Sequence, residues 1–209
     1  MYSITRLIDV AAGRCDRVVP ALRGLAADCG ADRGVVAPTL TGSRNGGDLL
    51  MHLRFERKDT WQSVAAEIEA TLDHPDITRV NGADYHGAPT VVADRAPGTV
   101  YRTLLVHVEA DADSDSVRKF EADLCALPRY VSSIGAWQLS RPAHTVGSTA
   151  WTHVFEQEFS DADGIMGPYL MHPFHWAVVD QWFDAECPNS IVRERVCHSF
   201  CESPPTVLR

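Results

Sequence analysis

The sequence predicts an α+β fold in which two ferredoxin-like repeats follow each other and close into one barrel within the chain. Three observations predict it. The length of 209 residues suits two units of about 100 residues each. The predicted strands and helices occur twice in the same order, and a segment rich in proline and small residues, 89–99, reads as the linker between the two copies.

The first half, residues 1–88, has the order strand, helix, strand, strand, helix, which is the split arrangement of a ferredoxin-like fold. Gly30 is placed to end the first helix, and His74-Pro75 the second. The predicted elements are a strand over 4–10, a helix over 15–29, strands over 35–41 and 49–55 joined by a glycine-rich turn, and a helix over 61–72 capped by Asp59-Thr60.

The second half, residues 100–185, repeats this order, and residues 186–209 form a C-terminal extension. Within the extension we expect Cys197 and Cys201 to share one helix face, and Pro204-Pro205 to begin a disordered end. The predicted elements are a strand over 101–109, a helix over 117–126 capped by Ser114 or Ser116 and stopped by Pro128, strands over 134–140 and 151–159, and a helix from Asp161 toward Met171 that stops at His172-Pro173.

The two sheets explain why the halves would join. The two helices of a half cover only one face of its sheet, so the other face must be buried against a second sheet. Strand 151–159 supports this, because its odd positions are large and mostly apolar but include His153 and Gln157. We expect this mixed face to line an enclosed ligand cavity between the sheets.

Composition limits the partners. A net charge of −9 provides no basic surplus for a nucleic acid or an anionic membrane surface. No apolar run approaches the roughly 18 residues that span a bilayer, and the first residues lack the apolar core of a signal peptide. The six scattered cysteines are typical of reduced thiols in the cytoplasm. We therefore expect a cytoplasmic protein with a small-molecule ligand.

Histidine and tyrosine side chains of the second half could carry acid–base chemistry. Imidazole has an ordinary pKa of about 6.5, which suits proton transfer near neutrality. A helix that starts at Pro173 would hold His175 in its first turn, where the helix dipole disfavours the protonated ring. Tyr169 lies one turn before His172, close enough for its hydroxyl to approach His175. Such a pair could polarise a carbonyl and remove a C–H proton, which an aldol-type cyclisation or an enolisation requires.

The sequence around Tyr169-Leu170-Met171-His172-Pro173-Phe174-His175, with strands 103–108 and 151–156, resembles the stress-responsive A/B barrel (Dabb) family of the dimeric α+β barrel superfamily. Within that family it is similar to the cofactor-free polyketide cyclases of the olivetolic acid cyclase type. The resemblance covers roughly residues 100–185, and it implies an intrachain dimeric α+β barrel. In the first half, His74-Pro75 is retained but Ile77 stands where the second histidine would be, so this half reads as a degenerate partner.

The resemblance implies His175, Tyr169 and His153 as catalytic residues. The first-strand histidine of the family is replaced by Thr103, and His107 on the same strand face could partly take over its role. We expect a polyketide-like or aromatic substrate, contacted by His107, His172, Thr103, Trp151 and Phe155, with no metal and no cofactor. Family members usually dimerise through their sheets, so a homodimer is a further expectation.

Other interpretations stay open. His172 could cap a helix end through its ring nitrogen, and His107 and His153 could be core histidines. The histidines at 107, 153, 172 and 175 could converge on a metal or a haem, although no HxH or HExxH pair supports this. The leading hypothesis is a cofactor-independent cyclase or related acid–base enzyme. The alternatives are a non-catalytic stress-responsive or binding protein, a cofactor-free monooxygenase, and a haem- or metal-binding barrel enzyme.

Overall fold

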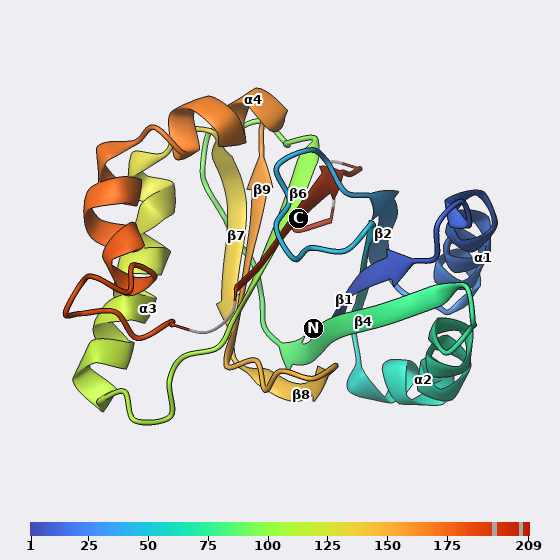
Figure 1. Ribbon diagram of the computed structural model, residues 1–209. Helices are drawn as coiled ribbons and strands as arrows, with labels where there is room; N and C mark the ends of the chain where they lie inside the picture. Colours follow the sequence, from blue (N-terminus) through green and yellow to red (C-terminus); the bar gives the residue numbers. More distant parts are fainter. Residues whose placement is uncertain (194–195, 205–206) are drawn as a thin grey trace.

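The computed structural model of the protein describes residues 1–193, 196–204 and 207–209. Two five-stranded antiparallel sheets stand face to face in the middle of the molecule, with α1 (Cys15–Asp28) and α2 (Lys58–Leu72) outside one sheet and α3 (Ser114–Tyr130) outside the other (Figure 1). The predicted α+β fold, with two ferredoxin-like halves joined through their sheets, is confirmed. Within the described residues, no helix has the length and apolarity that crossing a bilayer requires.

The first half forms one sheet with the strand order β2-β3-β1-β4. Its strands are β1 (Tyr2–Val10), β2 (Arg33–Pro38), β3 (Leu49–Phe55) and β4 (Ile77–His86). Gly30 follows the end of α1 with a φ of +73°, as expected for a helix C-terminal glycine. The predicted Asp59-Thr60 cap is wrong, because α2 begins at Lys58 and its cap residue, Arg57, makes no side-chain capping hydrogen bond.

The second half forms the other sheet with the order β10-β6-β9-β7. Its strands are β6 (Val100–Val106), β7 (Ile134–Ser140), β9 (His153–Phe159) and β10 (Val196–Glu202). The carboxylate of Asp113, next to the predicted serines, caps α3 by accepting hydrogen bonds from the Asp115 and Ser116 N–H groups. The prediction that Pro128 stops α3 is wrong, because the helix continues to Tyr130. Pro128 therefore lies in the last turn of the helix, where it removes one main-chain N–H donor.

The segment between β9 and β10 is irregular, where regular helices were predicted from Asp161 toward Met171 and from Pro173 onward. After α4 (Ala162–Gly164) come two π-helical turns, η1 (Ile165–Tyr169) and η2 (His175–Val179), and the 3₁₀ turn η3 (Asp180–Trp182). Pro168 has no N–H to donate, and the Leu170 N–H bonds the Ile165 carbonyl five residues back (3.1 Å). The proline therefore widens the helix and moves the following residues relative to the sheet.

Each sheet gains a fifth strand. β8 (Pro142–Val146) belongs to the second half in sequence but pairs with β4, and β5 (Thr90–Val91), in the predicted linker, pairs with β7. The halves are thus joined by main-chain hydrogen bonds as well as by packing.

The C-terminal residues differ from the prediction. Cys197 and Cys201 share a face of strand β10, where a helix was expected. Pro205 lies outside the described residues, but the disordered end predicted there is wrong for residues 207–209: Val207 and Leu208 are buried in the core between the sheets, and the Arg209 Nε atom lies 2.7 Å from a Glu158 carboxylate oxygen. Strand β10 therefore replaces the expected helix, and residues 207–209 pack against the rest of the protein where a disordered end was expected.

The space between the sheets is filled by side chains, so the expectation of a ligand cavity there is wrong. The odd positions of β9 face the helices, and Phe155 packs in the same core cluster as Phe120 of α3. The even positions face the other sheet, where Glu156 accepts a hydrogen bond from Tyr101 (2.8 Å) and approaches His52 Nε2 (3.4 Å). This fully buried polar network belongs to the interface between the halves.

Candidate functional site

A cavity of about 670 Å³ lies on the outer side of the second sheet, under the π-helical turns. Its floor is formed by β6 and β10, its cover by η1 and η2, and one wall by the β2–β3 loop of the first half. Most of its lining is apolar. The polar and charged lining residues are Arg44, Asn45, Arg102, Tyr169, His175, Asp180 and His198. An apolar cavity of this size with a few polar groups is typical of a small-molecule site.

Tyr169 and His175 meet in this cavity. Tyr169 ends η1 and His175 begins η2, and their ring centres are 4.4 Å apart in an edge-to-face arrangement. The Tyr169 side chain is buried and also packs edge-to-face on Phe159 (5.3 Å). The structure thus brings together the two residues that the sequence spacing suggested, through a chain turn that spacing alone did not specify.

The electrostatics of the cavity keep the histidine neutral and the tyrosine protonated. Burial, followed by the nearby Arg102 guanidinium, lowers the pKa of His175 from 6.5 to about 4. Burial raises the pKa of Tyr169 above its ordinary value of 10, and Arg102 opposes part of this rise. The helix dipole, which the sequence suggested as the cause, is replaced by desolvation and a fixed positive charge. Asp180 lies 3.6 Å from His175 Nδ1, which is longer than a hydrogen bond.

Two cavity residues were missed in the sequence. Arg102 on β6 is 4% exposed, and its guanidinium carbon lies 4.9 Å from the centre of the Tyr169 ring. His198 on β10 is held by the β2–β3 loop through two main-chain hydrogen bonds with Arg44 (2.7 and 2.8 Å). The signal for Arg102 was a charge within the otherwise uncharged strand 100–106, whereas His198 lies in a segment that was set apart as an extension.

His153, His107 and His172 lie outside the cavity lining. His153 is buried between β9 and α3, with Nε2 3.0 Å from a Glu121 carboxylate oxygen and Nδ1 2.9 Å from the Thr152 hydroxyl. The Nδ1 of His107 lies 2.6 Å from the Ala150 carbonyl oxygen. His172 Nδ1 accepts the N–H of Phe174 (3.1 Å), which is the capping arrangement considered for it. Among the residues with coordinates, no group of three or more His, Cys, Asp or Glu side chains could hold a metal ion.

The remaining predicted contact residues are core residues. Trp151 is buried between the sheets, and Phe155 is buried between the second sheet and α3. Thr103 is fully buried on β6, at an odd position beside Arg102, and therefore points to the other face of the sheet. None of the three is part of the cavity lining: Trp151 and Thr103 face the other sheet, and Phe155 packs against α3 beside the cavity.

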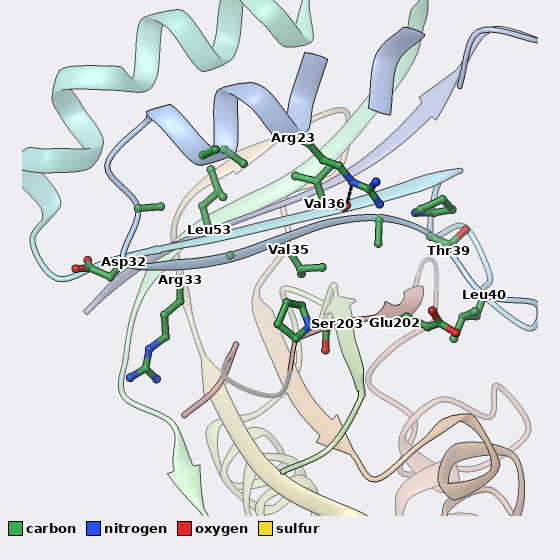
Figure 2. A pocket seen from close by; sticks show the side chains of 17 residues that line it. Arg23, Asp32, Arg33, Val35, Val36, Thr39, Leu40, Leu53, Glu202 and Ser203 are labelled. Atoms are coloured by element: carbon green, nitrogen blue, oxygen red, sulfur yellow. Dashed lines mark hydrogen bonds between the residues drawn. The ribbon is translucent and has the colours of Figure 1, made fainter. Parts of the chain in front are cut away.

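A larger cavity of about 870 Å³ lies at the edge of the first sheet, between β2, α1 and residues 202–204 (Figure 2). The Arg23 side chain closes part of it by donating a hydrogen bond from Nε to the Val36 carbonyl (3.0 Å). Its lining contains no histidine, cysteine or tyrosine. We therefore assign the candidate site to the smaller cavity, which holds the groups suited to proton transfer.

Comparison with known proteins agrees with this architecture. The solved structure of an anthrone oxidase-like protein gives a TM-score of 0.65 at 8% sequence identity, with 95% of this chain and 89% of that one covered. A monooxygenase-like protein from Lactobacillus acidophilus NCFM gives a TM-score of 0.56 at 10% identity, with 95% of this chain and 91% of that one covered. A chlorite dismutase from Candidatus Nitrospira defluvii gives 0.56 at 12% identity, with 99% and 93% covered. At these identities the likeness shows the fold alone.

A search of curated proteins finds no match. The sequence pattern of the stress responsive A/B barrel domain matches residues 100–197, which include Arg102, Tyr169 and His175 and end one residue before His198. Over residues 100–197, slightly less than half of the chain, the protein is therefore similar to the stress responsive A/B barrel (Dabb) domain family.

Proposed function

We propose that the protein is a cofactor-independent acid–base enzyme that catalyses an aldol-type cyclisation or enolisation of a polyketide-like or aromatic substrate. The observation that carries the proposal is the Tyr169–His175 pair in a largely apolar cavity, beneath a buried arginine. A lyase-type cyclisation needs only a neutral base, a proton donor and a shape that folds the substrate.

The chemistry follows from the protonation states. His175, with a pKa lowered to about 4, is an unprotonated base at neutral pH and could take a C–H proton next to a substrate carbonyl. Tyr169, with a raised pKa, keeps its proton and could donate a hydrogen bond to the carbonyl oxygen as negative charge develops there. The new carbon–carbon bond would then form between the enolate carbon and a second carbonyl of the same molecule. The proton held by His175 could return to the resulting alkoxide.

Tyr169→Phe and His175→Ala test the proposal. With a linear poly-β-keto thioester as substrate and mass spectrometry of the cyclised product, each change is expected to lower kcat by about 100-fold. Tyr130→Phe and His74→Ala are matched controls, because these residues are exposed and lie outside the cavity. Unchanged turnover in both cavity variants would exclude the pair from the mechanism.

A cofactor-free monooxygenase is the second candidate. It is favoured by the names of the structural neighbours, which include an anthrone oxidase-like and a monooxygenase-like protein. The same neutral His175 could deprotonate a phenol. Oxygen consumption with anthrone, lost in His175→Ala, would support this candidate over cyclisation. Tight binding of both substrate types without turnover would support a non-catalytic binding protein.

The remaining expectations are part of the proposal. We propose a cytoplasmic protein that acts on a small molecule, in which 89–99 links the first half, 1–88, to a second half that comprises 100–185 and, through β10, part of the predicted extension 186–209. A homodimer of the whole chain is a prediction that size-exclusion chromatography with light scattering would test.

A further inference from the structure

Arg102 differs from Arg6 and Arg54, the other fully or nearly fully buried arginines among the described residues. Arg6 pairs with Asp84 (2.7 Å), and Arg54 lies 3.9 Å from a Glu156 carboxylate oxygen. Arg102 donates a hydrogen bond to the side-chain carbonyl of Gln157. Across residues 1–193, 196–204 and 207–209, no carboxylate lies within ion-pair distance of its guanidinium. A buried cation normally has an anionic partner, because removing it from water is costly.

The first half offers a comparison, because its first strand also carries a buried arginine. Arg6 lies on β1 and Arg102 on β6, which are the first strands of the two halves. Each guanidinium lies over an aromatic ring of the helical layer, Arg6 at 5.9 Å from the Trp61 centre and Arg102 at 4.9 Å from that of Tyr169. In the first half, Asp84 supplies the negative charge from within the protein. In the second half, the corresponding region is the cavity.

Three buried nitrogen atoms in the cavity lack hydrogen-bond partners among the described residues. Arg102 Nε, His175 Nδ1 and His198 Nε2 are buried and make no hydrogen bond to any described residue. Burial and Arg102, in that order, lower the pKa values of both histidines, which places all three groups within one electrostatic environment. Asp180 is the carboxylate among the cavity residues, and its ion-pair contact is with His175. Arg102 therefore keeps donor capacity available to a ligand.

The rest of the lining suits an apolar body. The aliphatic and aromatic residues of the wall are Leu104, Leu124, Ile165, Val179, Phe183 and Phe200. Arg44 adds a second positive charge from the β2–β3 loop. We propose that Arg102, assisted by His198, binds the carboxylate of a small organic acid whose apolar body lies against this wall. The inference deepens the proposed function, on which it rests for its choice of site, by naming the charge of the substrate or product.

Calorimetric titration with 4-hexylbenzoate and its uncharged analogue 4-hexylbenzamide tests this. The wild-type protein should bind the benzoate about 10- to 100-fold more tightly than the amide, as expected for a charge-assisted hydrogen bond. Arg102→Met, which keeps the volume but removes the charge, should abolish that preference. Arg54→Met is the matched control: it removes a buried guanidinium outside the cavity and should retain the preference.

The proposal is overturned if wild-type protein binds the two probes equally or binds neither, a result that does not require any variant to fold. It is also overturned if folded Arg102→Met keeps the full preference. Tyr169→Phe separates it from the proposed function, because this variant should lose turnover while retaining the preference for the benzoate. Carboxylate preference in a protein that turns over no polyketide would reject the enzymatic role and leave the binding site standing.

Discussion

The two halves share one topology but use their helical layers differently. In the first half, α2 is a regular helix, and Trp61, Ile68 and Leu72 from it are buried against the sheet. The cavity beside His74 is about 350 Å³. In the second half, the equivalent segment is broken into π-helical turns, and the cavity there is about 670 Å³. The comparison shows that a helix interrupted by proline can hold space open over a sheet that a regular helix fills.

The His-Pro sequences of the halves have the same local geometry. His74 Nδ1 accepts the Asp76 N–H, and His172 Nδ1 accepts the Phe174 N–H, both at 3.1 Å. What differs is the residue that follows: Ile77 in the first half, His175 in the second. The shared histidine is therefore a local structural feature, and the chemistry depends on the second histidine and on the space around it.

The largest expected difference between the halves is in the energetics of their buried arginines. Asp84→Asn leaves Arg6 buried without its carboxylate and should lower the free energy of unfolding by about 3–5 kcal/mol. Arg102→Met should lower the free energy of unfolding by less than about 1 kcal/mol, because the charge that it removes has no carboxylate partner among the described residues. Urea unfolding of both variants measures this, and equal losses would contradict the distinction.

The pH dependence of stability should be dominated by the second half. His175 titrates near pH 6.5 when unfolded and at about pH 4 when folded, so the unfolded chain binds the extra proton between these values. Lowering the pH through this window should therefore decrease stability, by about 1.4 kcal/mol per pH unit for each such proton. His175→Gln should reduce the slope, and His74→Gln serves as the exposed control. A slope that is the same in wild type and His175→Gln would show that His175 is not buried in its neutral form.

The smallest effect is expected at the two caps. His74→Ala and His172→Ala each remove one side-chain to main-chain hydrogen bond and should each cost about 0.5–1 kcal/mol. Thermal unfolding followed by circular dichroism compares them. A much larger loss for His172→Ala would indicate a role that the first half lacks.

Strand alternation, turn glycines and helix periodicity are local signals, and they predicted the first three strands and the first helix of each half, but neither β4 nor β10. His172-Pro173 was correctly identified as an interruption between helical segments, whereas the effect of Pro168 was not predicted. The exchange of β8 into the first sheet had no local signal, since the pairing partner of an edge strand is set by tertiary packing. The same holds for the burial of Val207 and Leu208.

The site was predicted in part. Tyr169 and His175 were identified and do meet, but His153 was assigned to the cavity because its strand face was taken to point between the sheets. Which face of β9 meets the helices cannot be read from an alternating pattern when both faces are buried. Arg102 and His198 were missed for a related reason: each becomes a cavity residue only through β10, whose pairing with β6 joins residues almost 100 positions apart.

The β2–β3 loop has a consequence for how such a chain can diverge. Arg44 and Asn45 are seated on β10 by main-chain and amide hydrogen bonds, so the first half builds a wall of the chamber that the second half uses. In a homodimer of single halves, one sequence would have to form both the wall and the rest of the cavity. In a tandem chain the two halves can differ, so the first half can lose its own reactive side chains and still form part of the cavity wall of the second half.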